Sequence, residues 1–213
     1  NSSEGYVLTV TPDQVLIRAT SGAGLFYGVQ TMLQMADEKG LPVGVITDEP
    51  RFAYRGFMMD VSRHFFNKEF IKKQMDALAY YKLNRLHLHL TDAAGWRIEI
   101  KKYPRLTEFA AWREFPTWKE WWNNGRRYEE EGSKDAHGGY YTQDDIRELV
   151  AYAQERFITV IPEIEMPAHS EEVLTAYPEL SCTHEPYKQA DFCVGNEKTF
   201  EFLENVLTEV MEL

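Results

Sequence analysis

The segment RLHLHLTDAAGWR, residues 85 to 97, carries the residue types best suited to chemistry in this sequence. His87 and His89 stand two positions apart, so in a strand they would share one face. Asp92 and Trp96 follow directly. Two histidines on one face can bind zinc, an acid can work with a histidine in proton transfer, and a tryptophan can form a flat wall for a sugar ring. The segment therefore admits a metal site, a sugar site or an ordinary buried strand.

A metal site at the two histidines would need further ligands from later strand ends. Glu163, Glu165 and His169 are the candidates for those ligands. No second His-x-His pair occurs in the sequence, which weakens the metal interpretation. The alternative is that His87 and His89 are structural histidines with hydrogen-bonded rings. Both interpretations stay open on these residues alone.

Three buried strands and three amphipathic helices are predicted from residue 56 onward, in alternation. The strands lie at 56–62, 84–90 and 158–166, and the helices at 67–82, 142–157 and 196–213. Such alternation predicts an α/β fold with a parallel sheet, either a (β/α) barrel or an open doubly wound sheet. No GxGxxG or GxxxxGKS/T motif follows any of the strands. This argues against the nucleotide-binding doubly wound folds.

Polar residues gather at the carboxyl end of each predicted strand, the end that carries the active site in a barrel. They are Asp60, Ser62 and Arg63, then Asp92, and then Glu163, Glu165 and His169. Asp92 and His169 could form an acid–histidine pair that orients a third group. Arg63 follows the first strand and Arg55 precedes it. The guanidinium fork of either arginine suits vicinal hydroxyls or carboxylates, and the alternative for each is a salt bridge.

All the tryptophans lie in the long segment between residues 93 and 141: Trp96, Trp112, Trp118, Trp121 and Trp122. Tryptophans exposed there would form a binding surface, whereas buried ones would serve to fold the segment. Trp96 stands just past Asp92, so it either walls a site or packs in the core.

Residues 1–50 are interpreted as the end of a small α/β domain plus a linker, and residues 51–213 as a second domain. The first part is predicted to contain a hairpin at 6–10 and 14–19, followed by a helix. The apolar stripe expected on that helix is Leu25, Val29, Met32 and Leu33. Residues 41–54 are expected to form a linker with one short strand.

Composition and charge exclude several classes of protein. The formal net charge is −11, which disfavours a nucleic-acid surface because phosphate binding needs clustered Lys and Arg. No apolar run approaches the roughly 20 residues of a membrane span. Cys182 and Cys193 could close a short disulfide loop in an oxidising compartment or remain free thiols. A metal site at these cysteines is disfavoured, because no CxxC motif is present.

Several long segments together resemble the β-N-acetylhexosaminidases, the exo-acting family that includes bacterial chitobiases and lysosomal hexosaminidases. The matching segments are YRGFMMDVSRHFF, YYKLNRLHLHLTDAAGWRIEIKKYPRLTE, GGYYTQDDIRELVAYAQERFITVIPEIEMPAHS and CVGNEKTFEFLENVL. The resemblance implies a (β/α)8 TIM barrel, of which about the first three βα units would be present, preceded by the end of a small α/β domain. It also implies removal of terminal β-linked N-acetylglucosamine or N-acetylgalactosamine by a retaining, substrate-assisted mechanism.

The resemblance also assigns roles to individual residues. Arg55 matches a family arginine that binds hydroxyls of the terminal sugar. Trp96 falls in the family's GWR segment and is either structural or part of the substrate site. Asp92 and His169 match an Asp–His pair that tunes the proton affinity of the catalytic glutamate. The expected partner is an N-acetylhexosamine-containing oligosaccharide or glycoconjugate, with no nucleic acid, no metal and no organic cofactor. An extracytoplasmic location is implied as well.

The catalytic Asp-Glu pair of the family follows the fourth strand and is expected to lie beyond these residues. The Asp-Glu pairs present, Asp37-Glu38 and Asp48-Glu49, stand at a helix end and in the linker. The chain is therefore expected to be the first part of a barrel, inactive without the remainder. Two alternatives stay open: a non-catalytic sugar-binding relative, and a metal-dependent barrel hydrolase that uses His87 and His89.

Overall fold

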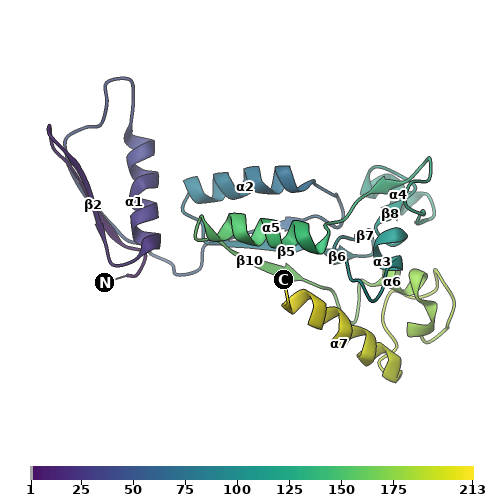
Figure 1. The fold of residues 1–213 in the computed structure, drawn as a ribbon. Helices are drawn as coiled ribbons and strands as arrows, with labels where there is room; N and C mark the ends of the chain where they lie inside the picture. The colour runs from purple at the N-terminus through teal and green to yellow at the C-terminus, as the bar shows by residue number, and fades with distance from the viewer. Residues whose placement is uncertain (1) are drawn as a thin grey trace. The chain divides into compact units, whose positions relative to one another are not determined.

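The structure is a computed structural model, and it describes residues 2–213 (Figure 1). Its strands are β1 Tyr6–Val10, β2 Val15–Ala19, β3 Gly44–Asp48, β4 Gly56–Asp60, β5 Arg85–His89, β6 Thr91–Asp92, β7 Gly95–Trp96, β8 Trp112–Arg113, β9 His137–Gly138 and β10 Thr159–Glu163. Its helices are α1 Gly22–Met35, α2 Lys68–Tyr80, α3 Arg105–Glu108, α4 Trp118–Asn123, α5 Gln143–Gln154, α6 Glu171–Ala176 and α7 Glu197–Met211, with a 3-10 turn η1 at Pro178–Leu180. The chain divides into two compact units, one made of residues up to Phe57 with 72–86 and 152–159, the other of 58–71, 87–151 and 160–213.

The first strands form an antiparallel sheet in the order β2-β1-β3. The predicted hairpin is present, with Tyr6 opposite Ala19 and Val10 opposite Val15. The short strand expected in the linker is β3, and it pairs with β1 along its whole length. The linker interpretation understated this segment, because β3 completes the sheet on the other side of β1.

Helix α1 packs through a different face from the predicted one. The predicted stripe is wrong because most of its members are exposed, namely Leu25, Val29 and Leu33. The buried residues of α1 are Gly24, Tyr27 and Gly28. A Cβ atom on Gly24 would lie 2.5 Å from the carbonyl oxygen of Gly5, and one on Gly28 would lie 2.6 Å from a methyl group of Ile17. The helix therefore meets the sheet through its smallest residues, which an apolar stripe does not reveal.

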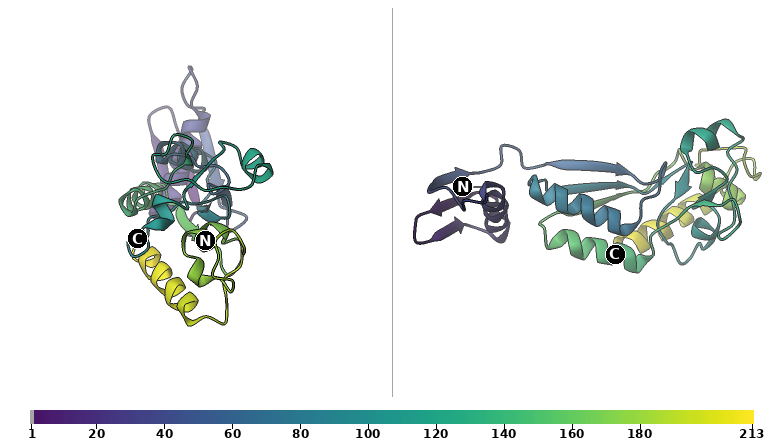
Figure 2. Two further views of the ribbon diagram at one scale, coloured as in Figure 1. Left: turned by 90° about the vertical axis from the view of Figure 1, so that its right-hand side faces the viewer. Right: turned by 90° about the horizontal axis from the view of Figure 1, so that it is seen from above.

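The second sheet has the strand order β10-β5-β4 (Figures 1 and 2). Arg55 and Asn84 precede β4 and β5, and Asn84 N donates to Arg55 O. At the other end of the sheet, Leu90 N, just after β5, donates to the carbonyl oxygen of Glu163, the last residue of β10. The strands therefore run in the same direction, and their carboxyl ends meet at one edge. A helix follows each strand along the chain, α2 after β4, α5 after β5 and α7 after β10. The described residues form an open sheet rather than a closed barrel.

Alternation along β5 separates the leucines from the histidines. Leu86 and Leu88 are buried, whereas His87 stands on the opposite face with part of its ring exposed. Helix α2 buries most of its apolar stripe, including Ile71 and Met75, whereas Phe70 is 37% exposed. Helix α5 begins at a reciprocal cap, in which Asp145 N donates to the Thr142 hydroxyl and Thr142 N donates to the Asp145 carboxylate.

The long segment after β5 contains short elements that the sequence pattern did not reveal, namely α3, β8, α4 and β9. After β10, α6 and η1 were also not predicted. Cys182 and Cys193 form a disulfide, which settles the question that their spacing left open. Within residues 2–213, every helix is too short or too polar to cross a bilayer.

Candidate functional site

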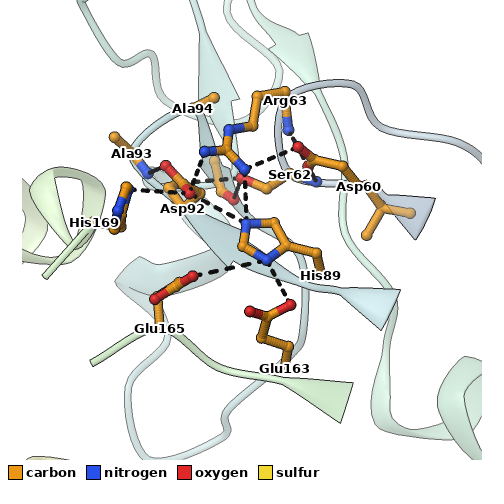
Figure 3. A network of polar contacts seen from close by, with 12 residues as sticks. Asp60, Ser62, Arg63, His89, Asp92, Ala93, Ala94, Glu163, Glu165 and His169 are labelled. Carbon is orange, nitrogen blue, oxygen red and sulfur yellow. Dashed lines mark hydrogen bonds and ion pairs between the residues drawn. The ribbon is translucent and has the colours of Figure 1, made fainter. Parts of the chain in front are cut away.

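The carboxylate of Asp92 lies at the centre of a polar network beyond the end of β5 (Figure 3). Its Oδ2 atom is 2.7 Å from Arg63 Nη2, 3.2 Å from His89 Nε2 and 3.3 Å from His169 Nδ1. The backbone N–H of Ala93 donates to Oδ1 at 2.8 Å. The Asp92 side chain is only 5% exposed. The structure thus brings together Asp92 and His169, which were predicted to pair although they lie 77 positions apart in the sequence.

The local fold fixes Asp92 in this place. Strand β5 ends at His89, and Leu90 N then donates to Glu163 O of the neighbouring strand. The chain reverses in the β6–β7 hairpin, in which Asp92 stands opposite Gly95. The Ser62 hydroxyl, which follows β4, donates to the carbonyls of Asp92 and Gly95. The carboxylate therefore sits on a turn that is bonded to both neighbouring strand ends.

His89 is a charged structural residue between two acids. Its Nδ1 is 2.8 Å from Glu163 Oε2, and its Nε2 faces Asp92. The hydrogen bond to Asp92 and the one to Glu163 raise the pKa of His89 to about 9, although burial works against the charge. Burial alone would raise the pKa of Asp92, but the hydrogen bond from His89 and the charges of Arg63 and His169 lower it. At neutral pH the centre therefore holds a protonated imidazole and an ionised carboxylate.

This pairing predicts how stability depends on pH. A histidine whose pKa rises on folding stabilises the fold fully below its unfolded pKa of about 6.5, and that contribution fades as the pH rises through the folded value. With His89 at about 9, we expect the free energy of unfolding to fall by about 3 kcal/mol between pH 6.5 and 9. Urea denaturation across this range measures it. The His89→Gln variant should show a flatter profile, and an equally steep profile would contradict the assignment.

The backbone around His169 is held by the disulfide loop, residues 182–193. Ser170 N donates to Ala190 O and Phe192 N donates to Pro167 O, both at 2.8 Å. These bonds bracket His169, whose backbone has a left-handed φ of 56°. The side chain of His169 is 57% exposed. The loop therefore helps to position an imidazole that is itself more than half exposed.

Removing this disulfide should loosen the His169 segment. We expect a Cys182→Ser, Cys193→Ser variant to lose about 2–4 kcal/mol of stability. The amide hydrogens of Ser170 and Phe192 should exchange faster, because each of their hydrogen bonds joins the His169 segment to the released loop. Hydrogen exchange with and without dithiothreitol tests this, and the reductant should have no effect on the double variant. Unchanged exchange at both amides would contradict the positioning role.

Arg63, rather than Arg55, is the arginine of the site. Arg63 binds Asp60 through Nη1 at 2.9 Å and Asp92 through Nη2, and its side chain is 37% exposed. Arg55 precedes β4, so the length of the strand separates it from the carboxyl end. It forms a salt bridge with Glu4 at 2.8 Å and donates to Lys82 O. The structure therefore contradicts the assignment of Arg55 as a substrate residue, and strand direction alone would have favoured Arg63.

Trp96 is also not placed to touch a substrate. It is 1% exposed, and its indole N–H donates to Ile98 O at 2.6 Å. A ring with both faces buried and its one polar group satisfied cannot form the wall of an open site. The substrate assignment of Trp96 is therefore wrong, and the packing alternative holds.

Of the residues predicted for a metal site, His89, Glu163 and Glu165 are close enough to share one ion, with ligand atoms within 4.8 Å of one another. His87 contacts Glu163 through Nε2 at 2.7 Å and does not complete this group. A histidine must present a free nitrogen lone pair to a metal. Both ring nitrogens of His89 already have partners: Nδ1 contacts the carboxylate of Glu163 at 2.8 Å, and Nε2 contacts Asp92 and Arg63 Nη1. The chemistry of this donor set therefore favours ion pairs over a metal centre.

Family comparisons decide the identity of the chain. The family model described as "Glycosyl hydrolase family 20, catalytic domain" matches residues 52–213, and "Glycosyl hydrolase family 20, domain 2" matches residues 1–49. The chain belongs to glycosyl hydrolase family 20. The resemblance inferred from the sequence is thereby confirmed, and the carboxyl edge of the second sheet is the edge of a family 20 catalytic domain.

Individual relatives agree with the family 20 assignment. A beta-hexosaminidase of Porphyromonas gingivalis is 44% identical over 229 residues, covering 99% of this chain and 27% of the relative. The crystal structure of a beta-N-acetylhexosaminidase from Bacteroides fragilis superposes with a TM-score of 0.83 at 39% identity, covering 99% of this chain and 41% of that one. A Vibrio harveyi family 20 exo beta-N-acetylglucosaminidase, in complex with N-acetylglucosamine, gives 0.83 at 35% identity, covering 98% and 34%. The chain thus spans less than half the length of these relatives.

Proposed function

We propose that the whole protein removes terminal β-linked N-acetylglucosamine or N-acetylgalactosamine from oligosaccharides or glycoconjugates. The observation that carries the proposal is the Asp92–His169 pair at the carboxyl edge of a family 20 sheet, with Arg63 on the same carboxylate. In this pair Nδ1 of His169 faces Asp92, so Nε2 is the nitrogen left to meet a third group. A catalytic carboxyl bonded there would have its proton affinity set by the charge of the pair.

The proposed mechanism is retaining and assisted by the substrate. The acetamido oxygen of the sugar attacks the anomeric carbon and forms a C–O bond, while the glycosidic C–O bond breaks and the leaving oxygen takes a proton from a glutamic acid. The same glutamate then removes a proton from the water that opens the oxazolinium intermediate. Asp92 and His169 act on this glutamate as positioning residues. No step requires a metal or an organic cofactor.

We propose that the glutamic acid comes from a segment outside these 213 residues. The Asp-Glu pairs within them, Asp37-Glu38 and Asp48-Glu49, lie just after α1 and at the end of β3, in the unit that does not contain Asp92. Residues 1–213 are therefore proposed to supply the Asp92–His169 pair, here called the relay, and part of the sugar site. The catalytic acid is proposed to come from elsewhere in the protein.

Arg63 is proposed to bind hydroxyls of the terminal sugar. Its guanidinium is anchored by Asp60 and Asp92, which leaves it oriented and partly exposed. An arginine held in this way offers its remaining N–H donors in a fixed direction. The disulfide between Cys182 and Cys193 supports an extracytoplasmic location for the protein, because such bonds persist in oxidising compartments.

The test compares the full-length protein with the isolated 213-residue chain on chromogenic N-acetyl-β-glucosaminide and N-acetyl-β-galactosaminide. We expect turnover by the full-length protein, with NMR showing the β-anomer of the sugar as the first product. The 213-residue chain should show none. Turnover by that chain alone would overturn the claim about the acid, and a full-length protein that binds but never hydrolyses would favour the sugar-binding alternative.

A further inference from the structure

A cavity of about 390 Å³ opens beside the Asp92 network. Arg63, Asp92 and His169 line it on one side, and Trp118, Trp122 and Arg126 line it on another. Its volume lies in the range of about 300–1,000 Å³ that is usual for small-molecule sites. The relay accounts for only one side of this cavity, so the tryptophan side, here named the aromatic wall, calls for a separate explanation.

Helix α4 builds the aromatic wall. The Thr117 hydroxyl caps the helix by accepting from Glu120 N. Trp121 points inward with 0% exposure, and its indole N–H donates to Arg127 O. Trp118 and Trp122, four residues apart, share the opposite face and remain 42% and 47% exposed. One buried tryptophan therefore anchors a short helix that presents two others.

The aromatic wall is held in place by contacts with its neighbours. The rings of Trp118 and Trp122 have centroids 5.4 Å apart and an interplanar angle of 31°. The guanidinium of Arg126 lies 4.8 Å from the Trp122 ring centroid and forms a 2.8 Å salt bridge with Glu171, whose side chain is 7% exposed. A buried acid thus fixes the arginine, and the arginine packs on the ring. Such preorganisation reduces the entropy that binding would otherwise cost.

The chemistry of the cavity indicates the class of ligand. Large exposed apolar side chains rimmed by charged groups mark binding sites. A pyranose ring has apolar C–H faces that pack on a flat indole and an edge of hydroxyls that bonds to charged side chains. Arg126 offers donors and Asp191, also in the lining, offers acceptors for such hydroxyls.

We propose that the aromatic wall binds the second sugar ring of the substrate, on the leaving-group side of the bond that is cleaved. This inference rests on the proposed function, since an exo-acting site takes the terminal sugar first and any further ring must lie on the leaving-group side. Trp118 and Trp122 supply the platform, and Arg126 and Asp191 bond the hydroxyls at its edge. The protein would thereby prefer oligosaccharides to glycosides with small leaving groups.

The test uses the full-length protein and two substrates that differ on the leaving-group side. One is N,N'-diacetylchitobiose, and the other is methyl N-acetyl-β-glucosaminide, whose leaving group is too small to reach the aromatic wall. Trp118→Ala and Trp122→Ala should each lower kcat/KM for the disaccharide about tenfold, while changing that for the methyl glycoside less than twofold. Trp118→Phe should restore most of the loss because it keeps a flat ring.

Tyr81→Ala is the matched control, because Tyr81 is an aromatic residue that is 71% exposed in the other unit. The Tyr81→Ala variant should leave kcat/KM unchanged for both substrates. Equal losses on both substrates in the Trp118 and Trp122 variants, or no loss on either, would overturn the inference while leaving the proposed function intact. If the unaltered protein hydrolyses neither substrate, the proposed function fails and this inference fails with it.

Discussion

Replacing Asp92 with Asn in the full-length protein should lower kcat/KM by about 100-fold or more. One oxygen of Asp92 meets Arg63, His89 and His169 together. An amide of the same size would remove the negative charge that these groups share and could turn an N–H donor toward them. His169 would then lose the carboxylate that orients its ring. The loss should fall mainly on kcat, because Asp92 acts through other groups.

The pH profile distinguishes this positioning role from a purely structural one. If Asp92 sets the proton affinity of the catalytic carboxyl through His169, Asp92→Asn should change the pH profile of kcat/KM in two ways. The maximum value should fall, and the apparent pKa values of the acidic and basic limbs should shift. Asp144→Asn is the matched control, because Asp144 is a surface carboxylate with 94% side-chain exposure that pairs with Arg147. A loss of kcat/KM smaller than threefold would contradict the relay. So would a pH profile of kcat/KM that is lower at every pH but keeps the same apparent pKa values.

The position of Asp92 was predictable because its determinants are local in sequence. A buried strand ends in a polar residue, and the parallel arrangement brings the ends of neighbouring strands to one edge. The same rule places His169 near Asp92, although only the structure shows that Nδ1 is the facing nitrogen. It also favours Arg63 over Arg55, since the two arginines flank β4 at opposite ends. The family resemblance, matched residue by residue, had assigned Arg55 instead.

The parts that sequence patterns missed depend on long-range packing. Helix α1 buries glycines where the pattern predicted leucines, because close backbone approach determines its packed face. Trp96 and Trp118 come from the same aromatic-rich segment, yet one is 1% exposed and the other 42% exposed. No local pattern separates them, because burial of each indole is decided by residues distant in sequence. The aromatic wall could therefore be recognised only from the structure.

Replacing Arg97 is expected to have the second large effect, a loss of stability. Arg97 is 1% exposed, and its guanidinium donates to five backbone carbonyls, those of Val61, Ser62, Ala94, Ala111 and Gly139. These carbonyls belong to the ends of separate strands and loops around the site. Burial, together with the charge of nearby Arg113, lowers the pKa of Arg97 to about 9, which still leaves it charged at neutral pH. Ala94 O also accepts from Arg113 Nη1, and Ala111 O also accepts from Gly139 N. The loss of Arg97 would therefore bear most on the carbonyls of Val61, Ser62 and Gly139.

Arg97→Ala should destabilise the chain by about 3–5 kcal/mol, because it leaves several buried carbonyls without donors and opens a cavity. Arg97→Lys should recover little of this, since an ammonium cannot reach acceptors spread around a planar fork. The position of the guanidinium in turn requires a glycine at residue 95, since a Cβ there would lie 2.3 Å from Arg97 Nη2. Urea denaturation measures the loss, and Arg147→Ala, at a surface pair, should cost less than about 1 kcal/mol. A loss for Arg97→Ala no larger than that of Arg147→Ala would show that the carbonyls find other partners.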